Sequence, residues 1–148
     1  MGPAVKRVSW GILGASTFAL EQMGPAIHMA KGTELAAVAS RDVRKITAFQ
    51  NFAPNCRAIS SYEELINDPE IDVIYIPLPH HLHKEWAIRA MNAGKHVLAE
   101  KPIAMHHCDF EDLLETRNTT GLLVSEAFMI VHHPQWQRAR QMVGNGAI

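Results

Sequence analysis

Short apolar runs alternate with helical stretches along this chain, and that order constrains the fold more than any other feature of the sequence. Parallel strands need long crossovers, which helices of about ten residues supply between one strand and the next. The apolar runs at 8–13 and 73–76 are nearly continuous, which is typical of strands in a sheet covered on both faces. We therefore predict an α/β fold with a doubly wound parallel sheet.

Strands and helices are expected in regular succession. The strands are expected at residues 8–13, 35–39, 57–59, 73–76, 96–99 and 122–127. The helices are expected at residues 18–30, 43–52, from Ser61 to near Asp68, and at 83–93, 110–116 and 135–143. A kink is expected at Gly24-Pro25, because proline removes a backbone donor from the helix. Ser61 and Glu64 have the spacing of a capping box, and Gly94 stands where a helix commonly ends.

The composition is that of an ordinary globular chain. Its 148 residues are 47% hydrophobic and 20% charged, and we treat residues 1–148 as one domain. The formal net charge of −1 provides no basic field, so no nucleic-acid partner is expected. No apolar run approaches the roughly 18 residues that span a bilayer, and the short segment ahead of the first strand leaves no room for a secretory signal. We expect a cytoplasmic protein with no membrane partner.

The first strand-to-helix turn carries the main functional signal. Residues Gly11 to Ser16 follow the phosphate-loop pattern G-x-x-G-x-G, with Ser16 in the place of the third glycine. Gly11 suits a close approach at the strand, and Gly14 with Ala15 brings backbone amides near a pyrophosphate at the positive end of the helix. Ser16 or Thr17 can cap that helix or donate to a phosphate oxygen. The loop predicts a Rossmann dinucleotide-binding fold; the alternative is a purely structural turn.

The end of the second strand bears on the choice of cofactor. A site that prefers NAD places an acidic side chain here for the ribose 2′-hydroxyl, whereas this strand ends Ala-Ser-Arg-Asp. Ser40 can donate to a 2′-phosphate, and Arg41 offers a planar fork that matches it. Lys45, or Arg44, lies about one helical turn further on and can add positive charge. We predict NADP(H), with NAD(H) as the alternative because Asp42 is one residue away.

Several motifs together resemble a known family. Gly11 and Gly14, the segment P-L-P-H-H-L-H at 77–83, A-G-K-H-V-L-A-E-K-P at 93–102 and E-A-F-M at 126–129 are similar to the glucose-fructose oxidoreductase, inositol dehydrogenase and rhizopine-catabolism family. Ser40-Arg41 and the segment 133–136 most resemble its dihydrodiol and D-xylose dehydrogenase branch. The resemblance covers the chain from residue 8 onward. It implies an NADP-dependent oxidoreductase that moves a hydride between the cofactor and a sugar or related alcohol or carbonyl substrate.

The resemblance also implies roles for individual residues. Lys101 matches the family's active-site lysine, beside the nicotinamide and the reacting oxygen of the substrate. An ammonium at the carboxyl end of a central strand can stabilise an alkoxide-like oxygen or pass a proton to it. The residues implied to contact the cofactor near the nicotinamide ribose and the diphosphate are Leu78, Pro79, His83, Glu100 and Lys101. Pro102 is implied to shape the backbone there, with a cis peptide bond as one way to do so.

Two departures from the family limit these expectations. Ile130-Val131 stands where the branch usually has Tyr-Arg, which puts the substrate in doubt. The family also has a second domain, which supplies the far wall of the substrate pocket and is absent from these 148 residues, so we interpret the chain as a fragment. The apolar surface at 128–136 is then expected to self-associate, as in a homo-oligomer, or to leave a disordered end.

Two alternatives to an enzyme remain open. One is a non-catalytic nucleotide-binding or regulatory module without a substrate domain, and the other is an interaction domain with a degenerate loop.

Histidine doublets at 80–81, 106–107 and 132–133 are poor chelators because adjacent side chains point in different directions. No metal site is therefore expected.

Overall fold

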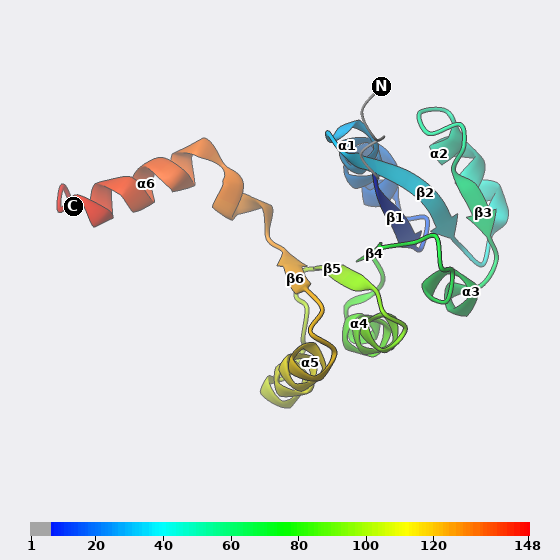
Figure 1. Ribbon diagram of the computed structural model, residues 1–148. Coiled ribbons are helices and arrows are strands. Elements are labelled where there is room, and N and C mark those ends of the chain that lie inside the picture. The colour runs from blue at the N-terminus through cyan, green and yellow to red at the C-terminus, as the bar shows by residue number, and fades with distance from the viewer. Residues whose placement is uncertain (1–6) are drawn as a thin grey trace, which may run out of the picture.

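The computed structural model describes residues 7–148 and arranges them around a parallel sheet, as the strand and helix pattern predicts (Figure 1). Its strands are β1 (Val8–Leu13), β2 (Thr33–Ala39), β3 (Arg57–Ile59), β4 (Val73–Ile76), β5 (His96–Glu100) and β6 (Val124–Ala127). Their order in the sheet is β3-β2-β1-β4-β5-β6, and every neighbouring pair is parallel. This is the doubly wound order of the Rossmann fold, with its switch point between β1 and β4. The expectation about a secretory signal concerns residues outside the described part of the chain.

Helices connect the strands. They are the π-helical turn η1 (Ala19–Met23), α1 (Gly24–Met29), the 3₁₀ turn η2 (Val43–Ile46), α2 (Thr47–Gln50), α3 (Tyr62–Ile66), the 3₁₀ turn η3 (His80–Leu82), α4 (His83–Asn92), α5 (His107–Thr120), the 3₁₀ turn η4 (Met129–His132) and α6 (Pro134–Gly144). No helix among residues 7–148 is both long and apolar enough to cross a membrane.

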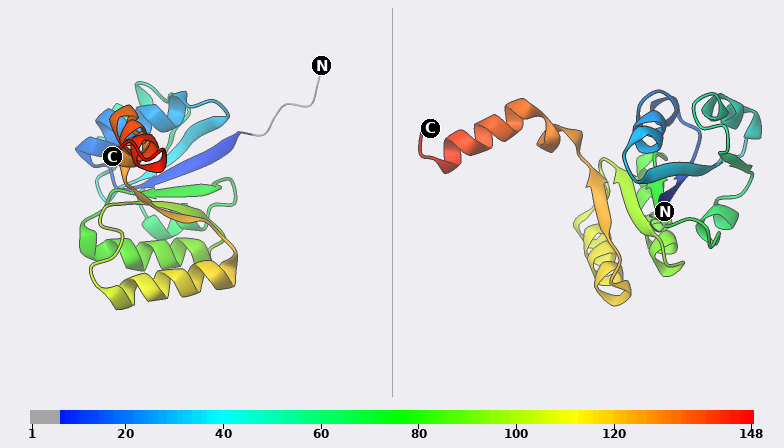
Figure 2. Two further views of the ribbon diagram at one scale, coloured as in Figure 1. Left: turned by 90° about the vertical axis from the view of Figure 1, so that its left-hand side faces the viewer. Right: turned by 45° about the horizontal axis from the view of Figure 1, so that its top comes forward.

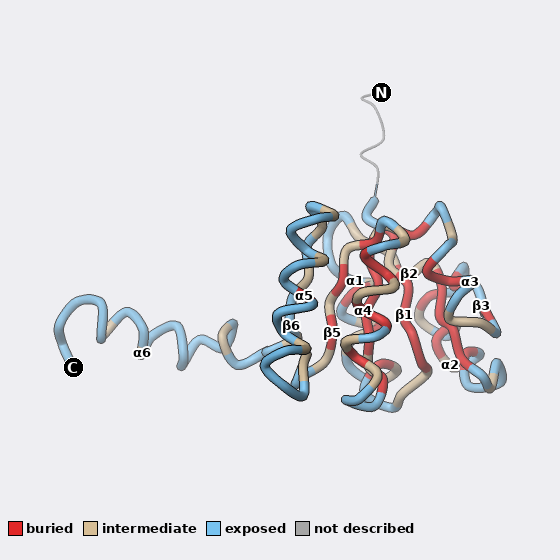
Figure 3. Tube along the Cα trace, turned by 90° about the horizontal axis from the view of Figure 1, so that it is seen from below, coloured by how far each residue is buried: buried red, intermediate tan, exposed pale blue. Residues whose placement is uncertain are grey.

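The core lies on both faces of the sheet. Successive residues of one strand point to opposite faces, so Ile12 packs with α1 and α2 while Leu13 packs with α3 and α4. Figure 2 shows α4 and α5 on one side of the sheet and α1 with α2 on the other. Burial is deepest along β1, β2 and β4, and it falls off toward β6 and α5 (Figure 3). Burial on two faces explains why the strands read as continuous apolar runs.

The expected kink in the first helix is a π-helical turn. The Gly24 N–H bonds to the Ala19 carbonyl five residues back, and Pro25 follows without an N–H to offer. A Cβ on Gly24 would lie 2.7 Å from that carbonyl oxygen and 3.0 Å from the Phe52 ring. Glycine therefore allows the widened turn to pack closely against the α2 region.

Helix boundaries differ most from the expectation in two places. The helix expected at 43–52 divides into η2 and α2 and ends at Gln50. The helix expected at 110–116 runs from His107 to Thr120, because His106 and Asp109 form a reciprocal capping box and Gly121 ends it in the left-handed region.

The last helix is formed and extends away from the sheet (Figures 1 and 2). The expected disordered end is therefore not what the structure describes. The segment that leads to α6 does expose large apolar side chains, with Phe128 49% and Met129 63% exposed.

Candidate functional site

A groove lies at the carboxyl ends of β1 and β4, where the strand order reverses. It consists of two cavities of about 470 and 430 Å³ that share Ser16, Pro77 and Leu78. The first cavity is lined by Gly14, Ala15, Ser16, Ser40, Arg41, Asp42, Lys45, Tyr62, Pro77, Leu78 and Pro79. The second is lined by Ser16, Phe18, Pro77, Leu78, His80, Glu100, Lys101 and Met129. Because they share a wall, we treat them as one switch-point groove with a β2 end and a β5 end.

The turn after β1 forms the floor of the groove. Gly14 adopts φ +100°, its N–H donates to the Ala39 carbonyl at 2.8 Å, and a Cβ there would lie 2.8 Å from Leu78 Cδ2. The Ala19 N–H donates to Ser16 Oγ at 3.1 Å, so the expected capping role of Ser16 is confirmed. Since the first N–H groups of a helix have no partner within it, the Ala15–Ser16 backbone can present donors to an anion.

Two residues of the predicted phosphate loop do not line the groove. Gly11 is buried in β1, where a Cβ would lie 3.0 Å from Leu65 Cδ1 and 3.2 Å from Ile74 Cδ1. Its lack of a side chain allows α3 to pack closely on the sheet, and the structure does not place Gly11 in the lining of the groove. Thr17 begins the helix and is exposed, but it lines neither cavity of the groove.

The β2 end gathers the expected basic residues. Arg41 and Lys45 both line it. Arg44 instead binds Asp42 through Nε to Oδ1 at 2.8 Å and Nη2 to Oδ2 at 3.1 Å. This ion pair holds the pKa of Asp42 below its usual range. Of the two basic residues considered for added charge, the structure thus brings Lys45 to the groove and uses Arg44 to neutralise Asp42.

Ser40 is buried at the same end. Its hydroxyl oxygen accepts from the Asp42 N–H at 3.1 Å, and its own N–H donates to the Ile59 carbonyl at 3.0 Å. The hydroxyl hydrogen is left to donate toward the groove, which Ser40 lines.

The β5 end carries a carboxylate and an ammonium. Glu100 is the last residue of β5, and its Oε1 accepts from the Tyr75 hydroxyl at 2.7 Å. Burial and this hydrogen bond raise the pKa of Tyr75 above its usual range, so the phenol remains a donor. Lys101 follows, exposed, and its peptide bond to Pro102 is cis. Beyond it, the Ile103 N–H donates to Glu126 Oε1 at 2.9 Å.

His83 is placed differently from the expectation. The side chain is fully buried, and its two ring nitrogens lie 2.7 Å from the Leu78 carbonyl oxygen and 2.8 Å from the Pro102 carbonyl oxygen. The ring therefore does not line the groove, and the structure does not bring His83 together with the other residues implied to contact the cofactor. A histidine in a matched motif does not reveal from sequence which way its ring points.

The groove also contains residues that the sequence did not single out. Tyr62 follows β3 and packs edge-on against Trp86, with ring centroids 5.2 Å apart. Phe18, His80 and Met129 line the β5 end. Their common signal is position, because ligands of open α/β sheets bind beyond the carboxyl ends of the strands.

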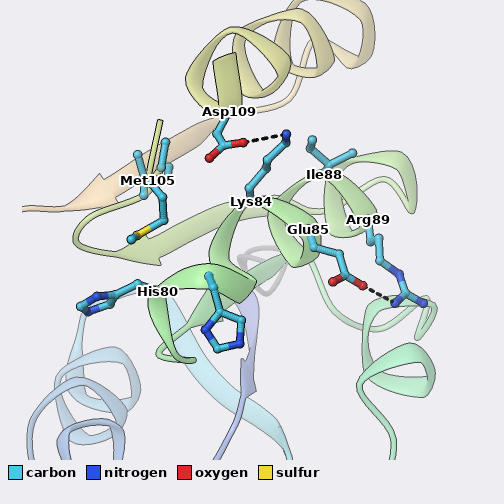
Figure 4. Close-up of a pocket in the computed structure, with 10 residues that line it drawn as sticks. His80, Lys84, Glu85, Ile88, Arg89, Met105 and Asp109 are labelled. Carbon is cyan, nitrogen blue, oxygen red and sulfur yellow. Dashed lines mark hydrogen bonds and ion pairs between the residues drawn. The ribbon is translucent and has the colours of Figure 1, made fainter. Parts of the chain in front are cut away.

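A further cavity lies between α4 and the segment that leads to α5 (Figure 4). Its charges are paired within the protein: Lys84 Nζ lies 2.8 Å from Asp109 Oδ1, and Arg89 Nη1 lies 3.3 Å from Glu85 Oε1. This cavity shares only His80 with the groove. The Lys84–Asp109 pair joins α4 to α5, whereas the Glu85–Arg89 pair lies within α4.

The sequence of this chain is similar to that of a known protein family and of several relatives. A family described as "Oxidoreductase family, NAD-binding Rossmann fold" matches residues 8–128. An uncharacterized oxidoreductase of Rhizobium meliloti is 44% identical, over 95% of this chain and 42% of the relative. A D-xylose 1-dehydrogenase (NADP(+)) of Haloferax volcanii is 35% identical, over 92% of this chain and 42% of the relative.

A solved structure also resembles this chain. A 3-ketoreductase from Actinomadura kijaniata, in complex with NADP and TDP-benzene, superposes with a TM-score of 0.88 at 35% identity. The match covers 96% of this chain and 43% of the ketoreductase. The chain thus spans less than half the length of these relatives, and the resemblance identified from its motifs is confirmed.

Proposed function

This chain belongs to the oxidoreductase family with the NAD-binding Rossmann fold, and on that basis we propose that it binds NADP(H) for hydride transfer to or from a sugar or a related alcohol or carbonyl compound. The D-xylose dehydrogenase and the NADP-bound 3-ketoreductase support this choice of cofactor and substrate class. The observation that carries the proposal is the switch-point groove, which runs from basic side chains after β2 to Glu100 and Lys101 after β5.

The groove fits an extended dinucleotide that carries a 2′-phosphate. Ser40, Arg41 and Lys45 would hold that phosphate with a hydroxyl donor, a planar guanidinium and a further positive charge. Asp42 is the acidic residue that could accept a hydrogen bond from a ribose 2′-hydroxyl, as in a site that prefers NAD, but its carboxylate is paired with Arg44. The β2 end therefore suits NADP(H) better than NAD(H).

The middle of the groove suits a diphosphate. Gly14 has no Cβ to block the approach, and the Ala15–Ser16 backbone stands at the positive end of the first helix. Leu78 and Pro79 would pack against the cofactor from the turn after β4. These residues bind and orient the ligand.

The β5 end would hold the nicotinamide beside Glu100 and Lys101. The cofactor, when bound, supplies or accepts the hydride. The Lys101 ammonium would stabilise negative charge on the substrate oxygen and transfer a proton to or from it. Glu100, fixed by Tyr75, would accept hydrogen bonds from the nicotinamide or its ribose.

A titration tests the proposal directly. NADPH and NADH are added to the 148-residue protein while cofactor fluorescence is followed. We expect NADPH to bind at sub-millimolar concentration and NADH to bind at least about tenfold more weakly, the loss expected for charged hydrogen bonds to a phosphate. If neither cofactor binds, the proposed function is wrong for this chain; if NADH binds more tightly, only the choice of NADP(H) is wrong.

A further inference from the structure

His83 bridges the two loops that form the β5 end of the groove. It is the first residue of α4, fully buried, with Nε2 2.7 Å from the Leu78 carbonyl oxygen and Nδ1 2.8 Å from the Pro102 carbonyl oxygen. Leu78 lies in the turn after β4 and lines both cavities of the groove. Pro102 directly follows Lys101. One rigid ring therefore spans from one wall of the groove to the residue next to the ammonium.

The chemistry of the ring suits this bridging position. A carbonyl oxygen only accepts, so each contact is a hydrogen bond only when the nitrogen in it carries a hydrogen. A neutral imidazole has one such hydrogen and a protonated imidazole has two. The ring thus donates to at least one of the two loops, and it donates to both when each nitrogen carries a hydrogen. Burial makes the bond costly to lose, because a buried carbonyl without a donor retains its full desolvation penalty.

Two other side chains hold the segment that contains Lys101. Tyr75 of β4 donates to Glu100 at 2.7 Å, and Glu126 of β6 accepts from the Ile103 N–H at 2.9 Å. Both act on the β5 side of the groove. Of these three tethers within residues 7–148, only His83 also reaches the turn after β4.

We propose that His83 is a positioning residue, which fixes the spacing between Leu78 and Lys101 and thereby shapes the nicotinamide end of the groove. The proposal rests on the function proposed above, because the spacing matters only if a dinucleotide lies in the groove. The charged side chains that would bind the 2′-phosphate, Arg41 and Lys45, follow β2, and His83 contacts neither of them. A positioning role therefore predicts that loss of His83 weakens binding of the nicotinamide half of the cofactor and leaves binding of the adenosine half unchanged.

The test compares two ligands on the 148-residue protein. On the function proposed above, NADPH would occupy the whole groove, whereas 2′,5′-ADP would occupy only the β2 end. We expect His83→Leu to weaken NADPH binding about tenfold and to leave 2′,5′-ADP binding within about twofold, the loss of one buried hydrogen bond being about this size. His83→Gln, which retains a donor, should recover most of the NADPH affinity. His81→Gln, an exposed residue of the same turn, is the matched control and should change neither affinity.

The outcomes separate this inference from the proposed function. If the unmodified protein binds no NADPH, the proposed function fails. If the unmodified protein binds NADPH and His83→Leu weakens both ligands equally, or weakens neither, the positioning role is wrong. Should His83→Leu not fold, the unmodified protein gives a second measurement by NMR. A His83 ring N–H that exchanges slowly with solvent is expected, and a rapidly exchanging one would overturn the bridge.

Discussion

The hydroxyl of Tyr75 donates a 2.7 Å hydrogen bond to Glu100, so a side chain buried in the sheet holds a carboxylate at the mouth of the groove. β4 and β5 pair in parallel, with Tyr75 opposite Leu98, which places Glu100 two residues further toward the carboxyl edge. Strand register thus sets where the carboxylate lies.

Tyr75→Phe tests this relationship. Removal of the hydroxyl leaves Glu100 without its buried donor, so NADPH affinity should fall about three- to tenfold and the free energy of unfolding by about 1 kcal/mol. Fluorescence titration and urea unfolding measure the two effects. The affinity for 2′,5′-ADP serves as the control and should not change. Equal NADPH affinity in the variant would show that Tyr75 does not position Glu100.

The sequence predicts the central strands well because they are buried on both faces of the sheet. Val73–Ile76 is apolar throughout, and no helical periodicity competes with that pattern. Prediction from sequence is less accurate at α5, which is longer than expected. His106 has no strong capping preference, yet it caps the helix together with Asp109, whose carboxylate accepts from the His106 N–H.

Within the site, residues fixed by backbone geometry were easier to predict than those fixed by side-chain direction. Gly14 lies where the loop pattern puts it, at positive φ. His83 and Gly11 were expected to contact the ligand, but the His83 ring is turned into the protein and Gly11 lies buried in β1. Tyr62 was missed because its approach to the groove depends on contacts made after β3, which no local motif encodes.

Arg41→Ala tests the choice of cofactor. The side chain lines the β2 end, where a charged hydrogen bond to a 2′-phosphate contributes about 1.5–3 kcal/mol. We expect NADPH affinity to fall about ten- to a hundredfold and NADH affinity to stay within about twofold. Lys31→Ala removes the same charge at the amino end of β2 and is the matched control. A parallel loss for both cofactors would exclude a specific contact between Arg41 and the phosphate.

Lys101→Met separates binding from chemistry. The variant retains the length of the side chain and loses the ammonium, so NADPH affinity should change by less than about threefold. If the chain has the activity proposed above, its sugar-driven NADP⁺ reduction should fall by about a hundredfold or more, the usual size of a lost acid–base or electrostatic group. Absorbance of the reduced cofactor is the measurement. Undiminished turnover would show that Lys101 takes no part in the chemical step.

The ion pairs between α4 and α5 predict a pH dependence of stability. Lys84 lies 2.8 Å from Asp109 and 2.6 Å from Asp112, and its hydrogen bond holds the pKa of Asp109 below the usual range. A carboxylate with a lowered folded-state pKa stabilises the protein above its unfolded pKa, about 3.9, and this contribution is lost as pH falls through the folded pKa.

Lys84→Met should therefore flatten the acid side of the stability profile. Urea unfolding from pH 7 to pH 3 is expected to show a larger loss of stability for the unmodified protein than for the variant, because the variant has no pair to lose. Lys31→Met, at an exposed lysine before β2, should follow the unmodified protein. Identical profiles for all three proteins would mean that the pair contributes nothing to folding.

Gly14→Ala tests the contact between the phosphate loop and Leu78. The backbone there has φ +100°, and a Cβ would lie 2.8 Å from Leu78 Cδ2, so alanine introduces both backbone strain and a clash. Gly32 has φ +85°, and a Cβ there would meet nothing within 4 Å, so Gly32→Ala reports the strain alone. Strain of this kind costs about 1–3 kcal/mol and is common to both variants. Leu78 Cδ2 is the end of a side chain that can rotate away, so we expect Gly14→Ala to lower the free energy of unfolding only slightly more than Gly32→Ala. Only Gly14→Ala should also weaken NADPH binding, since its methyl group displaces the wall that both cavities share; equal effects of the two variants in urea unfolding and titration would mean that the loop tolerates a side chain at Gly14.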